Sequence, residues 1–245
     1  MSSLIGNHIQ KFDTLDSTNN YIAKYCESEK MAEGTVILAL EQTEGKGRFF
    51  KKWHSDTGQN LTFSFLLRPK NLKASTPLIL TKWVCSAICL YLENTGFKPV
   101  IKLPNDIFLN GKKVCGILIE NKLQNDLITR SIVGVGLNLN QVVFDSDFQH
   151  EATSLFKEDG SKRDIDQELN LLLSYLSYCF SRSLSDLEFT EFTFLKFLGR
   201  SCYRLTGDER EKINILSVQN EGVVTYQNEI EEIKSCALDD LKLQL

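Results

Sequence analysis

A stretch rich in glycine and basic residues is the first part of the sequence that could bind a charged ligand. Residues 44–48 read Glu-Gly-Lys-Gly-Arg, and two more lysines and Trp53 follow closely. Glycines let the backbone close on a ligand, while lysine and arginine neutralise phosphate or carboxylate oxygens. Gly47 follows Lys46 where a Walker A motif has serine or threonine, so that motif is excluded. The stretch predicts an anion-binding loop, with a solvated basic loop as the alternative.

Two further stretches place polar residues where a strand begins or ends. Residues 102–106 read Lys-Leu-Pro-Asn-Asp, so proline and two polar residues interrupt a strand. Such a break can direct an amide and a carboxylate into a cleft, although an ordinary turn has the same composition. Lys113 follows the Asn110-Gly111 turn and begins an apolar run, from which it could reach a carboxylate or phosphate as a point charge. A solvated lysine at a strand end is the alternative.

A pair of glycines inside a strand is the last local signal. Gly134 and Gly136 lie in an apolar run that ends at Asn138. Glycine within a strand often marks the close approach of a ligand or of another backbone. The third glycine and the following helix of a dinucleotide-binding motif are missing. Cys115, also in an apolar run, is predicted to be a core residue rather than a nucleophile.

The composition argues against several other classes of protein. The seven cysteines form no Cys-x-x-Cys pair, and the three histidines have no obvious acid–base partner, which disfavours zinc sites, disulfide frameworks and histidine-dependent hydrolases. A net charge of -4 disfavours a general attraction to nucleic acid. No run of about 18 apolar residues occurs, and the first residues do not resemble a signal peptide. We therefore expect a soluble, non-secreted protein.

The apolar patterns predict the helices and strands that must position these residues. Helical spacing indicates helices over residues 18–31, 77–96, 164–184 and 187–197. Short apolar runs indicate strands over residues 35–40, 61–67, 100–103, 107–109, 114–120 and 128–139, with a long loop over 41–60. From residue 199 onward, short β-branched runs alternate with turns. The sequence thus predicts an α+β fold with one domain over residues 1–198 and a small β-rich domain over 199–245.

Taken together, these stretches occur in the order and approximate spacing of the catalytic domain of biotin protein ligases, and the sequence resembles that family from Phe12 to Asn140. The matching motifs are residues 16–20 (Asp-Ser-Thr-Asn-Asn), 41–48, 102–106, 113–118 and 134–138. The resemblance implies the class II synthetase-like biotin/lipoyl ligase fold, a mixed β-sheet flanked by helices. The small C-terminal part looks like the SH3-like domain of the same family.

The resemblance also implies a role for individual residues. Those that it assigns to biotin are Ser17, Thr18, Asn19, Gln42, Lys46, Gly47, Arg48, Lys113 and Gly116. Those that it assigns to ATP are Arg48, Trp53, Asn105, Asp106, Lys113 and Asn138. Lys113 and Arg48 would act in catalysis, with Lys113 beside the biotin carboxylate and the α-phosphate, where it would steady charge as the two join.

By the same resemblance, biotin is activated with ATP to biotinyl-5'-AMP and then transferred to a lysine on an acceptor. The implied cofactors are ATP, biotin and Mg²⁺, and the implied partner is the biotin carboxyl carrier protein domain of a biotin-dependent carboxylase. A cytoplasmic location is expected, with no DNA partner and no membrane partner. Homodimers occur in the family. Too few residues precede the first motif for the helix-turn-helix domain of bifunctional members, so we predict no repressor activity.

Three departures from the family pattern, and two rival functions, qualify this interpretation. Lys46 replaces a common arginine, residues 49–52 read Phe-Phe-Lys-Lys where many members have a second Gly-Arg, and Leu103 replaces a tryptophan. Lysine cannot copy a bidentate arginine contact, so loop closure is the step most affected. The nearest rival is a lipoate or octanoate protein ligase of the same fold. A non-catalytic biotin or nucleotide sensor is the rival from another class.

Overall fold

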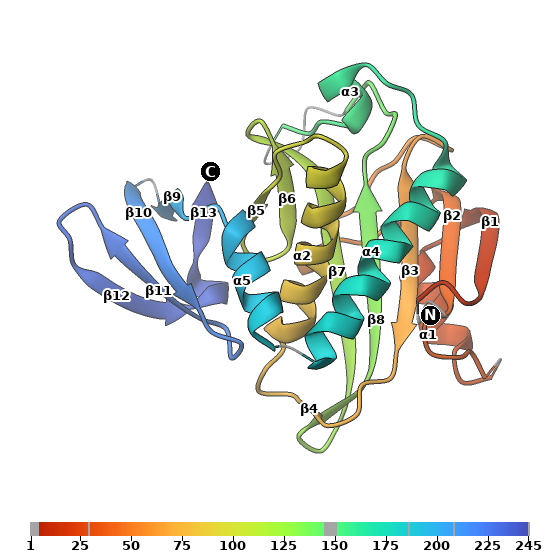
Figure 1. Cartoon of the computed structure of the whole chain (residues 1–245), viewed down its shortest axis with the longest axis horizontal. Helices are drawn as coiled ribbons and strands as arrows, with labels where there is room; N and C mark the ends of the chain where they lie inside the picture. The colour runs from red at the N-terminus through yellow and green to blue at the C-terminus, as the bar shows by residue number, and fades with distance from the viewer. Residues whose placement is uncertain (1–4, 29, 145–150, 186, 208, 245) are drawn as a thin grey trace.

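The computed structural model describes residues 5–28, 30–144, 151–185, 187–207 and 209–244 and contains two β-sheets (Figure 1). The larger sheet has eight strands in the order β1-β2-β3-β8-β7-β6-β5, with β4 paired to β8. Its strands are β1 (Ile9–Leu15), β2 (Val36–Gln42), β3 (Leu61–Leu67), β4 (Leu72–Lys73), β5 (Val100–Lys102), β6 (Asp106–Leu109), β7 (Lys112–Gln124) and β8 (Leu127–Leu137). The sheet is mixed, because β1 and β2 run parallel while the other pairs are antiparallel. The predicted mixed sheet is confirmed.

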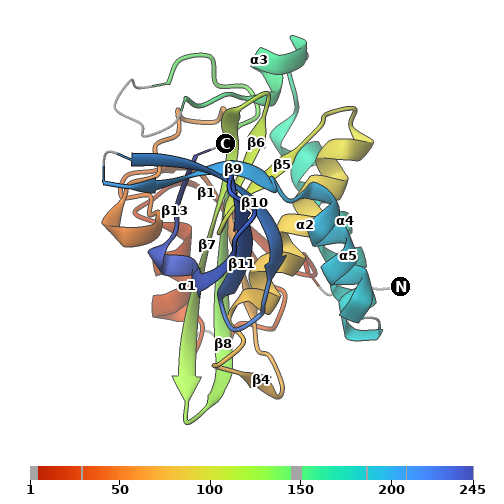
Figure 2. The ribbon, with the colours of Figure 1, turned by 90° about the vertical axis from the view of Figure 1, so that its left-hand side faces the viewer.

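Helices cover the two faces of this sheet unequally (Figures 1 and 2). The helices are α1 (Thr18–Tyr25), α2 (Leu78–Asn94), α3 (Leu155–Asp159), α4 (Ile165–Ser185) and α5 (Leu187–Phe197). Helices α2, α4 and α5 pack on one another over one face, while α1 packs on β2, β3 and β8 from the other. No helix among the described residues is long and apolar enough to cross a membrane.

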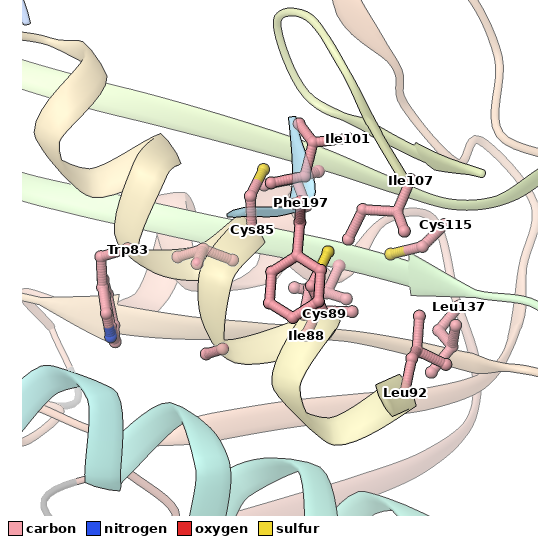
Figure 3. Close-up of a cluster of buried hydrophobic side chains, with 14 of the residues drawn as sticks. Trp83, Cys85, Ile88, Cys89, Leu92, Ile101, Ile107, Cys115, Leu137 and Phe197 are labelled. Carbon is pink, nitrogen blue, oxygen red and sulfur yellow. The ribbon is translucent and has the colours of Figure 1, made fainter. Parts of the chain in front are cut away.

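The main hydrophobic core lies between the sheet and α2 (Figure 3). Ile88 and Phe197 from the helices lie beside Ile107 and Leu137 from the strands, Trp83 lies further along α2, and all five are buried. A smaller cluster on the opposite face joins Ile22 and Cys26 of the α1 segment to the sheet. All of β3 is buried. Its odd-numbered residues from Leu61 to Leu67 belong to the main core, while on the other face Leu66 joins the smaller cluster and Thr62 and Ser64 are buried polar residues.

The smaller sheet lies at the C-terminal end and is antiparallel, in the order β12-β11-β10-β9-β13. Its strands are β9 (Ser201–Thr206), β10 (Glu209–Val218), β11 (Val223–Asn228), β12 (Ile233–Ala237) and β13 (Lys242–Gln244), with the short 3₁₀ helix η2 (Leu238–Asp240) before the last. Lys82 of α2, only 3% exposed, donates to the Val218 carbonyl at 2.6 Å and so joins this sheet to the larger part. A small C-terminal β-rich part is confirmed, whereas the domain boundary after residue 198 stays a prediction.

The predicted end of the first helix was wrong, and the first strand was missed. The first helix ends at Tyr25, six residues before the predicted end. Strand β1 was not predicted, because none of its residues is buried and an exposed edge strand leaves little apolar pattern. The Asn110-Gly111 turn is confirmed, with φ values of 48° and 76°, as a two-residue hairpin turn requires.

Candidate active site

The candidate site lies on the face of the larger sheet that α2, α4 and α5 leave uncovered. On β8, Val133 and Val135 belong to the helix-side core, so Gly134 and Gly136 between them face the opposite side. Gly136 pairs in register with Gly116 on β7, and Gly116 pairs with Asp106 on β6. The glycines and charged residues singled out in the sequence therefore meet on one surface.

A buried polar cluster, here called the head site, occupies one end of this surface and consists of Thr18, Asn19, Gln42 and Ser64. Ser17 caps α1 and so fixes where its first residues lie. Thr18 donates its backbone N–H to the Gln42 amide oxygen at 2.8 Å, and its hydroxyl lies 2.6 Å from that of Ser64. Thr18 and Asn19 are each 3% exposed and Ser64 is fully buried. The predicted biotin residues Ser17, Thr18, Asn19 and Gln42 are thus brought together.

Asn19 lies directly above Gly134, and its carboxamide is bonded at both ends. It donates to Glu120 at 2.6 Å and accepts from the Ser64 hydroxyl at 2.5 Å. A Cβ atom on Gly134 would collide with the Asn19 amide oxygen. The sequence had suggested a ligand or a backbone as the reason for a glycine here, and the structure corrects this: the close neighbour is a side chain of the same chain.

Trp53 lies on the floor that Gly116 and Gly136 form next to the head site. A Cβ atom on Gly136 would overlap the indole ring, and one on Gly116 would stand 3.0 Å from it. The indole Nε1 is buried and has no hydrogen-bond partner among the described residues. Trp53 therefore offers a flat apolar surface and one unused donor within the site.

Charged residues mark the other end of the surface. The Lys113 ammonium lies 2.6 Å from the Asp106 carboxylate and 5.7 Å from the centre of the Trp53 ring. Lys102 pairs in register with Asp106 and is 8% exposed. Burial lowers the pKa of Lys102, and the nearby Asp106 offsets part of this effect. Two lysines and one carboxylate leave an excess of positive charge that suits an anionic group.

The basic loop, residues 44–52, lies at the rim rather than inside the site. The Lys46 ammonium donates to Asn20 at 2.5 Å, and Gly47 donates its N–H to the Lys51 carbonyl. Arg48 begins the 3₁₀ turn η1 (Arg48–Phe50) and bonds Asp239 of the C-terminal part at 2.9 Å. A cavity of about 960 Å³ lies between this loop, β7 and the C-terminal residues 237–239. Lys46, Gly47 and Arg48 therefore surround a space large enough for a nucleotide-sized ligand.

Asn105 and Asn138 lie near the charged end, and both use their amide groups on the main chain. Asn105 donates to the Ile117 carbonyl at 2.5 Å. Asn138 is 3% exposed and donates to the Thr153 carbonyl at 2.9 Å. In the described structure these bonds hold neighbouring segments in place.

Cys115 faces the helix-side core, where burial raises the pKa of its thiol well above the usual value, and this confirms its prediction as a core residue.

Sequence reasoning missed three residues that shape the site, Ser64, Glu120 and Asp239, and it singled out the stretch that contains Lys102 without giving Lys102 a role. One signal was present for Ser64, because it interrupts the apolar run of β3 together with Thr62 at a spacing of two residues. For Glu120 and Asp239 the sequence carried no local signal. Each touches a residue more than 100 positions away along the chain.

Comparison with known proteins identifies the family. The model of the Biotin/lipoate A/B protein ligase family matches residues 11–138. Over 99% of its length the chain is 31% identical to the bifunctional ligase/repressor BirA of Bacillus subtilis (strain 168), of which it covers 76%. It is 33% identical, over 51% of each chain, to the biotin--[acetyl-CoA-carboxylase] ligase of Paracoccus denitrificans.

A solved structure gives the same result for the fold. The biotin protein ligase from Aquifex aeolicus, determined in complex with biotin and ATP, superposes with a TM-score of 0.76 at 25% identity. The match covers 97% of this chain and 99% of the other. Sequence and structure agree, and the chain therefore belongs to the biotin/lipoate A/B protein ligase family.

Proposed function

We propose that this protein is a biotin protein ligase, which joins biotin to ATP as biotinyl-5'-AMP and then transfers biotin to a lysine of a biotin carboxyl carrier protein. One observation carries the proposal. A buried polar pocket and a lysine–carboxylate pair, Lys113 and Asp106, lie at opposite ends of one glycine-floored surface. Biotin has the matching form, with a polar ring at one end and a carboxylate at the other.

In the first step the biotin carboxylate oxygen attacks the α-phosphorus of ATP, and pyrophosphate leaves with the bonding electron pair. The two reactants are both anions, so the barrier falls when positive groups offset their charge. Lys113 would take this role, and its ammonium group at the charged end, beside Trp53 and Asp106, supports the proposal. The ring of biotin would then lie against the head site, beside the Trp53 indole that covers the floor formed by Gly116 and Gly136.

The basic loop would contribute charge and closure. Lys46 and Arg48 line the large cavity, and each holds a polar partner at the protein surface. We propose that both exchange these partners for phosphate oxygens when ATP binds, while Gly47 allows the loop to approach the ligand closely. A loop closed over the adenylate would keep water from the mixed anhydride.

The nucleotide-side roles of Trp53, Asn105, Asp106 and Asn138 stay proposals. Asn105 and Asn138 each use one amide hydrogen on a main-chain carbonyl. A nucleotide contact by either residue would therefore use the second amide hydrogen or the amide oxygen. The unused indole N–H of Trp53 is available to an oxygen of the nucleotide or of biotin.

In the second step the acceptor lysine amine attacks the carbonyl carbon of the mixed anhydride, and AMP leaves. The carrier protein would present its lysine at the mouth of the large cavity, which β7 and the basic loop border. The amine must arrive unprotonated to attack, and the positive charge of Lys102 and Lys113 favours that neutral form.

Magnesium would bind together with ATP. No group of three or more His, Cys, Asp or Glu side chains among the described residues could hold a metal ion by itself. Phosphate oxygens and water commonly supply most ligands of Mg²⁺ in ATP-dependent enzymes, so this arrangement fits an ion carried by the nucleotide. When bound, the ion would offset phosphate charge, and Asp106 is the carboxylate at the charged end that could join its ligands.

We also propose a cytoplasmic location. The seven cysteines are free thiols, six of them buried, as in proteins of reducing compartments, and the reaction consumes ATP. The absence of DNA and membrane partners stays a prediction, and so does a homodimer.

Isotope exchange between pyrophosphate and ATP tests the proposal, because it reports the first step without the acceptor. We expect exchange with biotin and none with lipoate at the same concentration. Exchange with lipoate alone would identify a lipoate ligase, and no exchange with either acid would favour the sensor. Transfer of biotin to a purified carrier domain, followed by mass spectrometry, then tests the second step.

A further inference from the structure

A chain of four polar side chains crosses the head site and connects helix α1 with strands β3 and β7. In the register of the sheet, Ser64 on β3 and Leu118 on β7 stand on either side of Gly134. Glu120 lies two residues beyond Leu118 and therefore projects from the same face. The Asn19 carboxamide spans the gap above Gly134, with its oxygen toward Ser64 and its nitrogen toward Glu120.

The chemistry of Glu120 sets the direction of every hydrogen bond in this chain. An ionised carboxylate can only accept, so the end of Asn19 that faces Glu120 is its NH₂ group. The Asn19 oxygen then faces Ser64, whose single hydroxyl proton is donated to it. Because Ser64 has no second proton, its 2.6 Å contact with Thr18 is made by the proton of Thr18, whose other acceptor, the Gln42 amide oxygen, is more distant at 3.1 Å. Donation therefore runs from Thr18 to Ser64, to Asn19, and to Glu120.

This direction fixes what the head site offers to a ligand. The Thr18 hydroxyl has given its proton away and keeps a lone pair, so it can accept. The Gln42 oxygen accepts the backbone N–H of Thr18, and the Gln42 NH₂ group has no hydrogen-bond partner among the described residues. The site thus presents an acceptor and a donor close together. A cyclic urea has the complementary groups, an N–H and a carbonyl, whereas a dithiolane ring has neither.

We propose that Ser64 and Glu120 are positioning residues that select a cyclic urea, because they orient the hydroxyl of Thr18 and the amide of Asn19. The proposal rests on the proposed function and names two residues outside the predicted site. Neither residue needs to touch the ligand. They prevent rotation of the Thr18 hydroxyl and a flip of the Asn19 carboxamide, which keeps the pattern of donors and acceptors the same before and after binding.

Kinetics of pyrophosphate exchange at varied biotin and saturating ATP test this role. We expect Ser64→Ala and Glu120→Ala each to raise the KM for biotin by about three- to tenfold, the effect of one lost hydrogen bond, with kcat nearly unchanged. Glu120→Gln keeps an oxygen that can accept from Asn19, so it should restore most of the loss. The KM for ATP should not change in any of the three variants.

Ser131→Ala is the matched control. Ser131 is also a fully buried serine of the same sheet, and its hydroxyl bonds Asn121 at 2.7 Å, away from Thr18 and Asn19. The melting temperature of Ser131→Ala should fall below that of the wild type by about as much as that of Ser64→Ala, while its KM for biotin stays within twofold of the wild type. Because Glu120 is exposed, Glu120→Ala should fold even if Ser64→Ala does not.

The outcomes separate the two proposals. A KM for biotin within twofold of the wild type in Glu120→Ala, or an equal rise in Ser131→Ala, would overturn the positioning role. An unchanged KM with a reduced kcat would overturn it too, because binding would then be unaffected. If the wild type itself shows no exchange with biotin, the proposed function fails before any substitution is compared, and this inference fails with it.

Discussion

The head site and the basic loop differ in how firmly the protein holds their side chains. Thr18, Asn19 and Ser64 are buried and are bonded to one another and to the sheet. Arg48 and Lys46 instead hold partners at the surface, and the Arg48–Asp239 pair has side chains that are 30% and 73% exposed. Buried networks keep one arrangement, whereas an exposed ion pair contributes about 0–1 kcal/mol and exchanges easily.

The difference indicates a division of labour. If biotin binds as proposed, the end that recognises the ring is formed in advance, so little conformational entropy would be lost there. The end proposed to bind phosphate would have to release its surface partners and close on the ligand. Recognition and closure can therefore be disturbed separately, and the substitutions below are chosen to do so.

Lys113→Ala should have the largest effect of these substitutions. It removes the ammonium group from the charged end, and the loss of one such electrostatic contact typically lowers the rate by about 10²–10³-fold. We expect pyrophosphate exchange to fall by at least 100-fold while circular dichroism shows a folded protein. Lys112→Ala is the control, because Lys112 pairs with the exposed Glu151 and should change exchange less than twofold. Near-normal exchange by Lys113→Ala would refute the catalytic role.

Gly136→Ala should have the next largest effect. The added methyl group must displace the indole of Trp53 from the floor of the site. We expect biotin to bind at least about tenfold more weakly in calorimetry, since small displacements at such sites have large effects. In a Trp53→Ala background the same glycine substitution should cost little, because the overlapping ring is gone. An equal loss in both backgrounds would show that the overlap with Trp53 is not the cause.

Asp239→Asn tests the loop and should act more weakly. It removes the charge that holds Arg48 to the C-terminal part, so the KM for ATP should change by at most about fivefold, in line with an exposed pair. The KM for biotin should not change, because the head site is untouched. High salt should abolish the difference from the wild type. Glu93→Gln, which breaks the exposed Lys196–Glu93 pair elsewhere, should leave both constants as they are.

The pH dependence of stability provides the subtlest test. Burial holds the pKa of Lys102 below that of an unfolded lysine, about 10.4. Between these two values the unfolded chain binds more protons than the folded one, so the Lys102 contribution to the free energy of unfolding rises with pH. Lys102→Met lacks this contribution. Denaturant titrations should therefore favour the wild type over the variant increasingly as pH rises from 7 to 10, whereas a constant difference would contradict the assignment.

Local features of the structure could be predicted from the sequence. The first helix begins at the predicted residue 18, Asn110 and Gly111 form the expected hairpin turn, and the long helix α2 begins within two residues of its predicted start. Each of these depends on interactions between residues close together along the chain. The order of the motifs is also a property of the sequence, and the structure brings several of them to one surface, whereas their ligand-binding roles stay predictions.

Features set by strand register could not be predicted. Ser64 and Glu120 gain their place in the site because β3 and β7 flank β8, and nothing near either residue indicates that pairing. The contact of Arg48 with Asp239 joins residues 191 positions apart. Gly134 and Gly136 were expected to face a ligand or another backbone, but the fold places the side chains of Asn19 and Trp53 against them.

Calorimetric binding without ATP tests the central claim most directly, because that claim is that the head site is formed before the loop closes. Biotin should bind the wild type with saturable heat in the absence of nucleotide, and lipoate should not. The same titration with Glu120→Ala should give weaker binding of biotin. Binding of biotin only after ATP is added, or equal binding of lipoate, would contradict the account.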